Sequence, residues 1–298
     1  MAEEKNRVAL ISVFAAIFLT GFKVIIGLLT GSLGILSEAL HSFLDLVAAI
    51  ITYFSVRVSD KPADQHHHYG HGKIENLSAL IETLLLLITC VWIIYEAVNR
   101  LISGNTHIDI NIWSYIVVIS SIVVDINRSR MLSRVAKKHN SQALEADAIH
   151  FSTDIWSSSV VLFGLVCANF GWFFADSVAA LGVSVIVLSV SYRLGKKSID
   201  VLLDKAPQDT IEIVHKALAL FPEVRHYHGL KVRTAGADTF IKFNIHLESD
   251  MTLTQLHELC DRIEGALSLL IPRSEIFIHA EPHDIKHLQS ESINKPGN

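Results

Sequence analysis

Two His-x-x-x-Asp motifs lie far apart in the sequence, each inside a largely apolar stretch. The first joins His41 to Asp45, and the second joins His150 to Asp154. Residues four apart lie on one face of a helix, so each motif places an imidazole beside a carboxylate. Ionisable groups inside a membrane-spanning helix are costly and usually functional. Two such pairs that face each other predict a four-ligand site for a divalent metal ion.

The ligand types favour a metal of intermediate softness. Two imidazoles and two carboxylates complete a tetrahedral shell for Zn²⁺, whose His and Asp ligands lie at ~2.0–2.2 Å. A catalytic zinc keeps one position open for water, and this set leaves none, so no enzyme activity is expected. The two carboxylates neutralise a divalent ion, and an empty site has to take up protons in its place. The pattern therefore predicts metal carriage linked to protons.

The composition indicates which elements position these motifs. Of the 298 residues, 50% are hydrophobic and only 18% are charged, against about a quarter charged in soluble domains. A membrane-spanning helix needs ~20 mostly apolar residues, and six stretches qualify, of which the second and fifth carry the motifs. These predicted spans cover about residues 8–30, 34–58, 77–101, 110–132, 143–169 and 174–195.

The distribution of Lys and Arg predicts the orientation. With six spans, one side receives both termini and the loops after the second and fourth spans, and it collects most of the Lys and Arg residues near the spans. The other side collects Arg100 and little else. Because positive charge marks cytoplasmic loops, both termini should be cytoplasmic. No exposed basic face interleaved with aromatic residues is evident, so nucleic-acid binding is not expected.

The pattern changes near Pro207 to that of a soluble domain. Amphipathic segments predict helices over 209–220 and 252–270, and alternating segments predict strands over 230–234, 239–248 and 274–279. This αββαβ order predicts a small α+β domain with its helices on one face of one sheet. The expected domains are a six-helix transmembrane domain over 1–206, a cytoplasmic domain over 207–286 and a disordered tail over 287–298.

Two further groups of His and acidic residues are candidate metal sites outside the membrane. The predicted loop between the second and third spans contains Asp64, three successive histidines and His71. It is either a solvated His-rich tract or a second site formed by Asp64, His67 and His71, and position alone does not choose among His66, His67 and His68. The other group lies in the C-terminal domain and contains five histidines and one glutamate. Each of these residues alone is typical of a protein surface, but together they favour metal binding. Its members are His228, His246, His257, His279, Glu281 and His283.

These motifs together resemble the cation diffusion facilitator family of metal/proton antiporters, and most closely its bacterial zinc-efflux branch. The similarity covers about residues 8–285 and rests on four segments. These are residues 37–45, residues 62–73, residues 146–154 and residues 245–248.

The resemblance implies a role for individual residues. It implies a transport site of His41, Asp45, His150 and Asp154, a loop site of Asp64, His67 and His71, and a cytoplasmic binuclear site of His228, His246, His257, His279 and Glu281. Glu281 stands where bacterial relatives often carry Asp. Lys73 and Asp204 match an ion pair at the hinge between the membrane and cytoplasmic parts. The family also implies a homodimer joined through cytoplasmic domains of metallochaperone-like fold, in the lipid of a bacterial inner (plasma) membrane.

The leading hypothesis is Zn²⁺/H⁺ antiport out of the cytoplasm, with Zn²⁺ as substrate and as a structural or regulatory ligand. One alternative is a carrier whose main substrate is Cd²⁺, Fe²⁺, Co²⁺ or Mn²⁺, although His at position 41 resembles the zinc-selective members. Another is a metal-sensing or assembly protein on the same fold, against which the four intact ligands argue. A third is an intramembrane metalloenzyme, which the closed ligand shell and the absence of an HExxH motif oppose.

Overall fold

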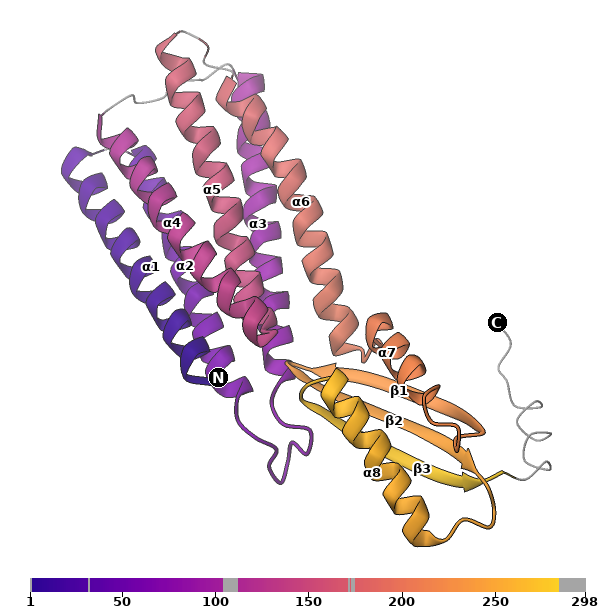
Figure 1. The fold of residues 1–298 in the computed structure, drawn as a ribbon. Helices are drawn as coiled ribbons and strands as arrows, with labels where there is room; N and C mark the ends of the chain where they lie inside the picture. Colours follow the sequence, from indigo (N-terminus) through magenta and orange to yellow (C-terminus); the bar gives the residue numbers. More distant parts are fainter. Residues whose placement is uncertain (1, 32, 104–111, 171, 173–174, 284–298) are drawn as a thin grey trace. The chain divides into compact units, whose positions relative to one another are not determined.

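The computed structural model describes residues 2–31, 33–103, 112–170, 172 and 175–283 (Figure 1). The chain divides into two compact units, Met1–Leu202 and Leu203–Asn298. The predicted disordered tail over 287–298 lies outside the described residues.

The first unit is a bundle of six long helices (Figure 1). They are α1 (Ala2–Thr30), α2 (Leu33–Ser59), α3 (Lys73–Ser103), α4 (Ile112–His139), α5 (Gln142–Asn169) and α6 (Ala175–Leu202). The most extensive packing joins α1 to α2, α4 to α5 and α3 to α6. In the last pair Gly195 allows close approach, because a Cβ there would lie 3.1 Å from the Thr83 Cγ2 atom.

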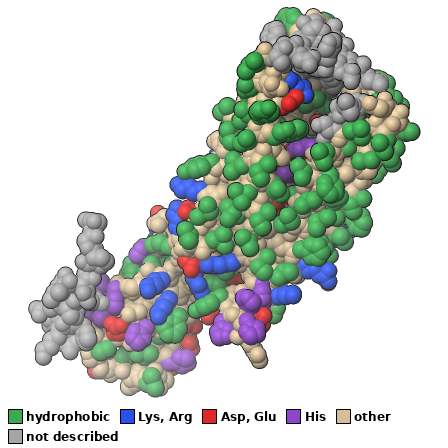
Figure 2. Space-filling view, turned by 180° about the vertical axis from the view of Figure 1, so that it is seen from behind, with side chains coloured by type: hydrophobic (Ala, Val, Ile, Leu, Met, Phe, Trp, Pro, Cys, Tyr) green, Lys and Arg blue, Asp and Glu red, His purple; other side chains and the backbone are tan. Residues whose placement is uncertain are grey.

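Five helices of the described chain are long and apolar enough to cross a membrane. They contain the candidate spans Glu3–Thr30, Glu38–Ser59, Lys73–Ile102, Ile112–His139 and Ser177–Leu202. Large apolar side chains such as Phe14, Phe18 and Trp92 are exposed on this unit, and Figure 2 shows such side chains covering much of one face. The helix α5 is not among the five, although its 28 residues reach about 42 Å. The sixth span therefore stays a prediction.

Several helices extend past the predicted ends of the spans. The helix α1 begins at Ala2, where residue 8 was expected; α4 continues to His139 past the expected residue 132, and α6 continues to Leu202 past residue 195. The helices are longer than the predicted spans because hydropathy measures only the part of a helix that suits hydrocarbon, and the span boundaries stay a prediction. A helix satisfies its own backbone hydrogen bonds and continues equally well into water.

A buried lysine ties several helix ends of the first unit together. The Lys5 Nζ atom lies 2.5 Å from Asp60 Oδ1 and 3.0 Å from Glu75 Oε1. The hydroxyl groups of Ser59 and Ser141 also donate hydrogen bonds to Glu75. Lys5 is only 3% exposed and Glu75 only 2%. The network therefore joins α1, the end of α2, the start of α3 and the residue before α5.

The second unit has the αββαβ order that the sequence predicts. Its elements are α7 (Gln208–Leu218), β1 (His226–Ala235), β2 (Asp238–Leu247), α8 (Leu253–Leu270) and β3 (Ser274–Pro282). The sheet order is β1-β2-β3, with β1 antiparallel and β3 parallel to β2. A capping box formed by Thr252 and Gln255 starts α8. The expected α+β fold is confirmed.

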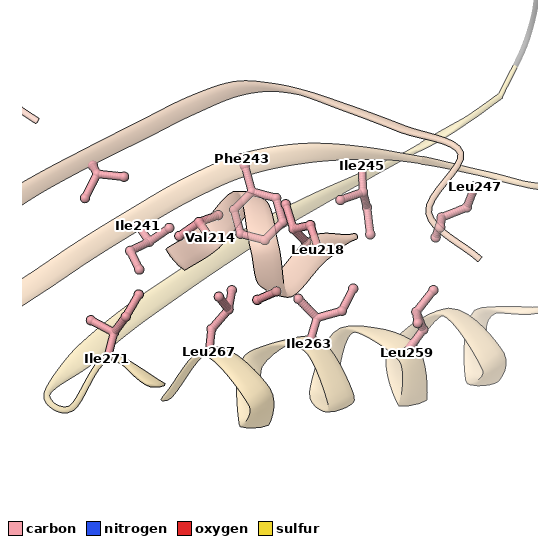
Figure 3. Close-up of a cluster of buried hydrophobic side chains, with 12 residues drawn as sticks. Val214, Leu218, Ile241, Phe243, Ile245, Leu247, Leu259, Ile263, Leu267 and Ile271 are labelled. Atoms are coloured by element: carbon pink, nitrogen blue, oxygen red, sulfur yellow. The ribbon is translucent and has the colours of Figure 1, made fainter. Parts of the chain in front are cut away.

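The core of this unit lies between the sheet and its helices (Figure 3). Alternate residues of β2 from Ile241 to Leu247 point toward α8, which contributes Leu259, Ile263 and Leu267. Because successive strand residues point to opposite faces, the even-numbered residues of β2, among them His246, lie on the other face. The face away from the core therefore carries polar side chains such as His246 together with aromatic ones such as Phe240 and Phe277.

The strand β1 begins at His226, four residues before the predicted start at Leu230. Its pairing with β2 is irregular between His228 and Lys231, and Gly229 there has a φ of +64°. A glycine in this left-handed region is a common feature of a bulge, and it interrupts the alternation that the prediction used. The correction places His226 and His228 in the sheet.

Candidate metal centres

The helices α2 and α5 bring the two His-x-x-x-Asp motifs together. The His150 Nε2 atom lies 3.1 Å from Asp45 Oδ1 and 3.5 Å from Asp154 Oδ2. The His41 Nε2 atom lies 3.6 Å from Asp154 Oδ1 and 3.9 Å from Asp45 Oδ1. The four groups therefore form a closed ring in which imidazoles and carboxylates alternate.

This ring suits a single divalent cation. One ligand atom each from His41, Asp45 and Asp154 lies within 4.8 Å of the others, and His150 contacts both carboxylates. Asp45, His150 and Asp154 are all buried, whereas the His41 side chain is 22% exposed. Buried carboxylates need a compensating charge, which a bound cation or protons supply. The geometry brings together all four residues of the predicted transport site, and their role in transport stays a prediction.

A second buried lysine braces the first half of this ring. The Lys23 Nζ atom, on α1, donates hydrogen bonds to Ser42 Oγ at 2.8 Å and to Glu38 Oε2 at 3.2 Å. The hydroxyl of Thr20 donates to the Ser42 carbonyl oxygen. These contacts fix the part of α2 next to His41. They could not be predicted from the sequence, because the partners lie on different helices and their spacing follows no regular pattern.

The loop between α2 and α3 brings together Asp64, His67 and His71. The Asp64 carboxylate lies 3.4 Å from His67 Nδ1 and 3.4 Å from His71 Nε2, and the two imidazole ring centres are 4.4 Å apart. In the described structure His68 contacts the Gln65 carbonyl oxygen. The geometry therefore selects His67 from the three successive histidines, and its role as a ligand stays a prediction.

Backbone hydrogen bonds hold the Asp64 carboxylate in position. The amides of His66 and His67 donate to Asp64 Oδ1 at 2.8 and 2.7 Å. These donors, with the nearby His67 side chain, hold the pKa of Asp64 below its ordinary value. The carboxylate is therefore ionised at neutral pH and can bind a cation. Asp64 and His67 are exposed, whereas His71 is partly buried.

In the second unit, Glu281 lies at the centre of the predicted cytoplasmic site. Its carboxylate is 3.3 Å from His228 Nε2, 3.6 Å from His246 Nε2 and 3.6 Å from His279 Nε2. Burial acts to raise the pKa of Glu281, but the hydrogen bond from His228 and the charges of the two nearest histidines lower it overall. Asn244 donates a further hydrogen bond to Glu281 at 2.8 Å, a contact that the sequence analysis missed.

One predicted ligand of this site lies elsewhere. His257 is on the exposed side of α8, and its Nε2 atom is 3.6 Å from Asp261 Oδ2. It does not belong to the group of His228, His246 and Glu281 in the described chain. Its role as a ligand stays a prediction.

The two residues of the predicted hinge pair belong to different units. Lys73 starts α3 in the first unit, where its Nζ atom contacts the Leu202 carbonyl oxygen. Asp204 belongs to the second unit and lies 3.6 Å from Arg233 Nη1. The ion pair between Lys73 and Asp204 stays a prediction.

Comparison with known proteins decides the family. Residues 9–203 match the cation efflux transmembrane domain, and residues 206–283 match the cytoplasmic domain of cation efflux proteins. The chain belongs to the cation efflux family. This confirms the resemblance to cation diffusion facilitators that the motifs indicated. Members of the efflux family are membrane transporters of divalent metal ions, which fits the apolar helices of the first unit.

Individual relatives agree with this assignment. Over 278 residues the chain is 30% identical to the cation-efflux pump FieF of Escherichia fergusonii and to that of Cronobacter sakazakii, covering 93% of this chain and 92% of each relative. The metal-bound C-terminal domain of the CzcD transporter from Thermotoga maritima is 26% identical over 26% of this chain and 93% of its own, with a TM-score of 0.25. The family assignment rests on the sequence matches.

Proposed function

We propose that this chain exports Zn²⁺ from the cytoplasm in exchange for protons. The closed ring of His41, Asp45, His150 and Asp154 carries the proposal, because it supplies four ligands of the types that Zn²⁺ prefers. The relatives named cation-efflux pump FieF support metal export as the task.

Exchange follows from the charge of the ring. Two carboxylates balance one divalent ion, so a departing ion leaves negative charge that protons can offset. Imidazole is the side chain whose charge changes nearest neutral pH, which makes His41 and His150 the candidates for the coupled protons. A proton gradient directed inward can then drive the ion outward.

The proposed arrangement is a homodimer in a bacterial inner membrane, with both termini and the second unit in the cytoplasm. The excess of Lys and Arg on one side of the helices supports this orientation. The match of residues 206–283 to the cytoplasmic domain of efflux proteins supports the place of the second unit. Asp64, His67 and His71 would then meet metal on the cytoplasmic side.

The decisive experiment is metal flux in proteoliposomes with an imposed pH gradient, measured for Zn²⁺, Cd²⁺, Co²⁺, Fe²⁺ and Mn²⁺. Zn²⁺ is expected to move fastest and to move protons in the opposite direction. Good flux of Mn²⁺ or Fe²⁺ with poor flux of Zn²⁺ would contradict the zinc assignment. Zn²⁺ flux that moves no protons would contradict antiport.

His41 is the ligand on which selectivity should depend. His41→Asp gives the ring three carboxylates and one imidazole, which suits harder ions such as Mn²⁺. We expect the ratio of Zn²⁺ flux to Mn²⁺ flux to fall by on the order of tenfold. The matched control is His215→Asp, since His215 is an exposed histidine of the second unit that belongs to none of the candidate metal sites. An unchanged ratio in His41→Asp would show that another feature sets the selectivity.

We propose that the group around Glu281 senses cytoplasmic metal. Metal held by the folded site stabilises the bound arrangement by mass action. The change His246→Ala should then weaken the dependence of flux on cytoplasmic Zn²⁺ concentration and leave the maximal flux intact, because the transport ring is unchanged. An unaltered concentration dependence in the same flux assay would favour a purely structural role.

A further inference from the structure

Glu82 is a buried carboxyl group that belongs to neither the ring nor the buried lysine network. It lies on α3, and none of its surface is exposed. Its Oε1 atom accepts hydrogen bonds from the hydroxyls of Thr52, on α2, and of Ser78, one turn earlier on α3. Its Oε2 atom is buried and has no hydrogen-bond partner among the described residues. The carboxyl group is therefore held by one oxygen, and the other oxygen is available to a proton.

Glu82 lies between the ring and the helix ends that the buried lysine network joins. Its partner Thr52 is seven residues along α2 from Asp45 of the ring, which is ~10 Å at the rise of a helix. Along α3, Glu82 is also seven residues, or ~10 Å, from Glu75 of the network. The end of α2 meets the start of α3 there, because Ser59 donates a hydrogen bond to Glu75. Glu82 is thus about midway between the two sites.

The groups that face Glu82 connect it to the ring. The titratable groups whose charges act on it are Asp147 and His150, both on α5. Asp147 is three residues before His150, so it lies ~4.5 Å nearer the start of α5. On α6, Leu194 and Gly195 lie against this part of α3, and both are uncharged. Asp147 therefore stands between Glu82 and a member of the ring.

The two buried carboxyl groups differ in their compensation. The Ser12 hydroxyl donates to Asp147 Oδ2 at 3.3 Å and accepts from Arg128 at 3.1 Å, which brings a cation close to Asp147. In the part of the chain that the structure describes, no Lys or Arg side chain pairs with Glu82. A buried charge without a partner is costly, and a bound proton removes that cost. A proton is therefore the simplest compensation for Glu82.

Buried polar side chains continue from Glu82 toward the helix ends. Asn76, on α3, donates a hydrogen bond of 2.5 Å to Gln142 Oε1 at the start of α5, and its own Oδ1 atom is buried without a hydrogen-bond partner among the described residues. The neighbouring Ser141 donates to Glu75 at 2.6 Å. The side of Glu82 away from the ring is thus polar as far as the lysine network.

We propose that Glu82 carries protons between the ring and the cytoplasmic end of the bundle. The inference rests on the proposed exchange of Zn²⁺ for protons. When cytoplasmic Zn²⁺ binds to the ring, an imidazolium N–H bond breaks and the proton has to leave on that side. Glu82 accepts the proton as an O–H bond on Oε2 and then releases it to cytoplasmic water, which restores the group for the next proton. Asp147, which lies between, and bound water complete the path.

The test compares two modes of transport by Glu82→Gln in proteoliposomes. The amide keeps the shape of the side chain and accepts the same hydrogen bonds, but it cannot carry a proton. Zn²⁺ flux driven by a pH gradient should fall at least about tenfold together with its proton movement, because a positioned proton-transfer group contributes ~10²–10⁴-fold to a rate. Exchange of Zn²⁺ for Zn²⁺ at equal pH on both sides needs no net proton movement, so it should stay near that of the unmodified protein.

Two further variants frame this comparison. Glu145→Gln is the matched control, since Glu145 is an exposed residue of α5 that pairs with Lys197 at 2.6 Å, and it should change neither rate. Glu82→Asp keeps a carboxyl group at this depth, so it should restore part of the flux driven by the pH gradient.

The outcomes separate the role of Glu82 from the proposed exchange. If the unmodified protein moves protons against Zn²⁺ and Glu82→Gln does so equally fast, the role of Glu82 is overturned and the exchange stands. Equal losses of both transport modes would show that Glu82 only supports the bundle, which also overturns the role. Zn²⁺ flux without proton movement in the unmodified protein would contradict the exchange, and the role of Glu82 with it. Circular dichroism checks folding, and if Glu82→Gln unfolds, the ratio of the two rates in Glu82→Asp decides.

Discussion

Replacing Asp154 by Ala is expected to reduce metal flux by more than about 100-fold, because changes that only orient a metal ligand already cost 10–100-fold. Asp154 contacts both imidazoles of the ring, at 3.6 Å for His41 and 3.5 Å for His150. Its loss opens the ring and removes one of the two charges that balance a divalent ion. Zn²⁺ flux in proteoliposomes, at matched protein content, measures the effect.

A neighbouring residue provides the control for this change. Thr153 is also buried on α5, and its hydroxyl donates to the His150 carbonyl oxygen within the same helix. Thr153→Val keeps the shape of the side chain and removes no ligand, so flux should stay near that of the unmodified protein. Normal transport by Asp154→Ala, with the protein folded and reconstituted, would show that the ring is not the transport site.

Replacing Lys5 by Met is expected to destabilise the first unit by about 3–5 kcal/mol, the usual effect of removing one partner from a buried ion pair. Lys5 is the cation between Asp60 and Glu75, and without it two carboxylates remain in a place nearly closed to water. Stabilities of whole domains are only about 5–15 kcal/mol, so the loss is a large share of the total.

An exposed lysine gives the matched comparison. The Lys138 side chain is 60% exposed and pairs with Glu4, which is itself 42% exposed. Exposed pairs contribute little, so Lys138→Met should leave the unfolding temperature almost unchanged. Thermal unfolding in detergent, followed by circular dichroism, compares the two variants. Equal, small effects would mean that water reaches the Lys5 network and that it does not hold the helix ends together.

The sequence predicted the parts of the fold that repeat a simple pattern. Long apolar stretches located the helices, and alternation located β2, where Phe243 and Ile245 face the core. It did not predict the helix ends, because the charged residues beyond them carry no hydrophobic signal. Lys5 shows the same limit: its partners lie 55 and 70 residues away, and a charged side chain near a terminus is ordinarily exposed.

The sequence likewise predicted some contacts of the metal-site residues and not others. The four-residue spacing of His41 and Asp45 predicted a shared helix face, and the structure places them there beside His150 and Asp154. Which of the successive loop histidines meets Asp64 depended on a turn that spacing cannot specify. The start of β1 at His226 was missed because the irregular pairing between His228 and Lys231 interrupts the alternation of the strand.

The way the helices are paired has a mechanical consequence for the ring. His41 and Asp45 belong to α2, which packs chiefly on α1, whereas His150 and Asp154 belong to α5, which packs chiefly on α4; direct packing of α2 on α5 is slight. A buried hydrophobic cluster contributed by α1, α2, α4 and α5 joins the two pairs with or without an ion. An ion held by all four side chains would thus add a removable crosslink between the pairs, and its loading and release would change the stiffness of the bundle at the depth of the ring.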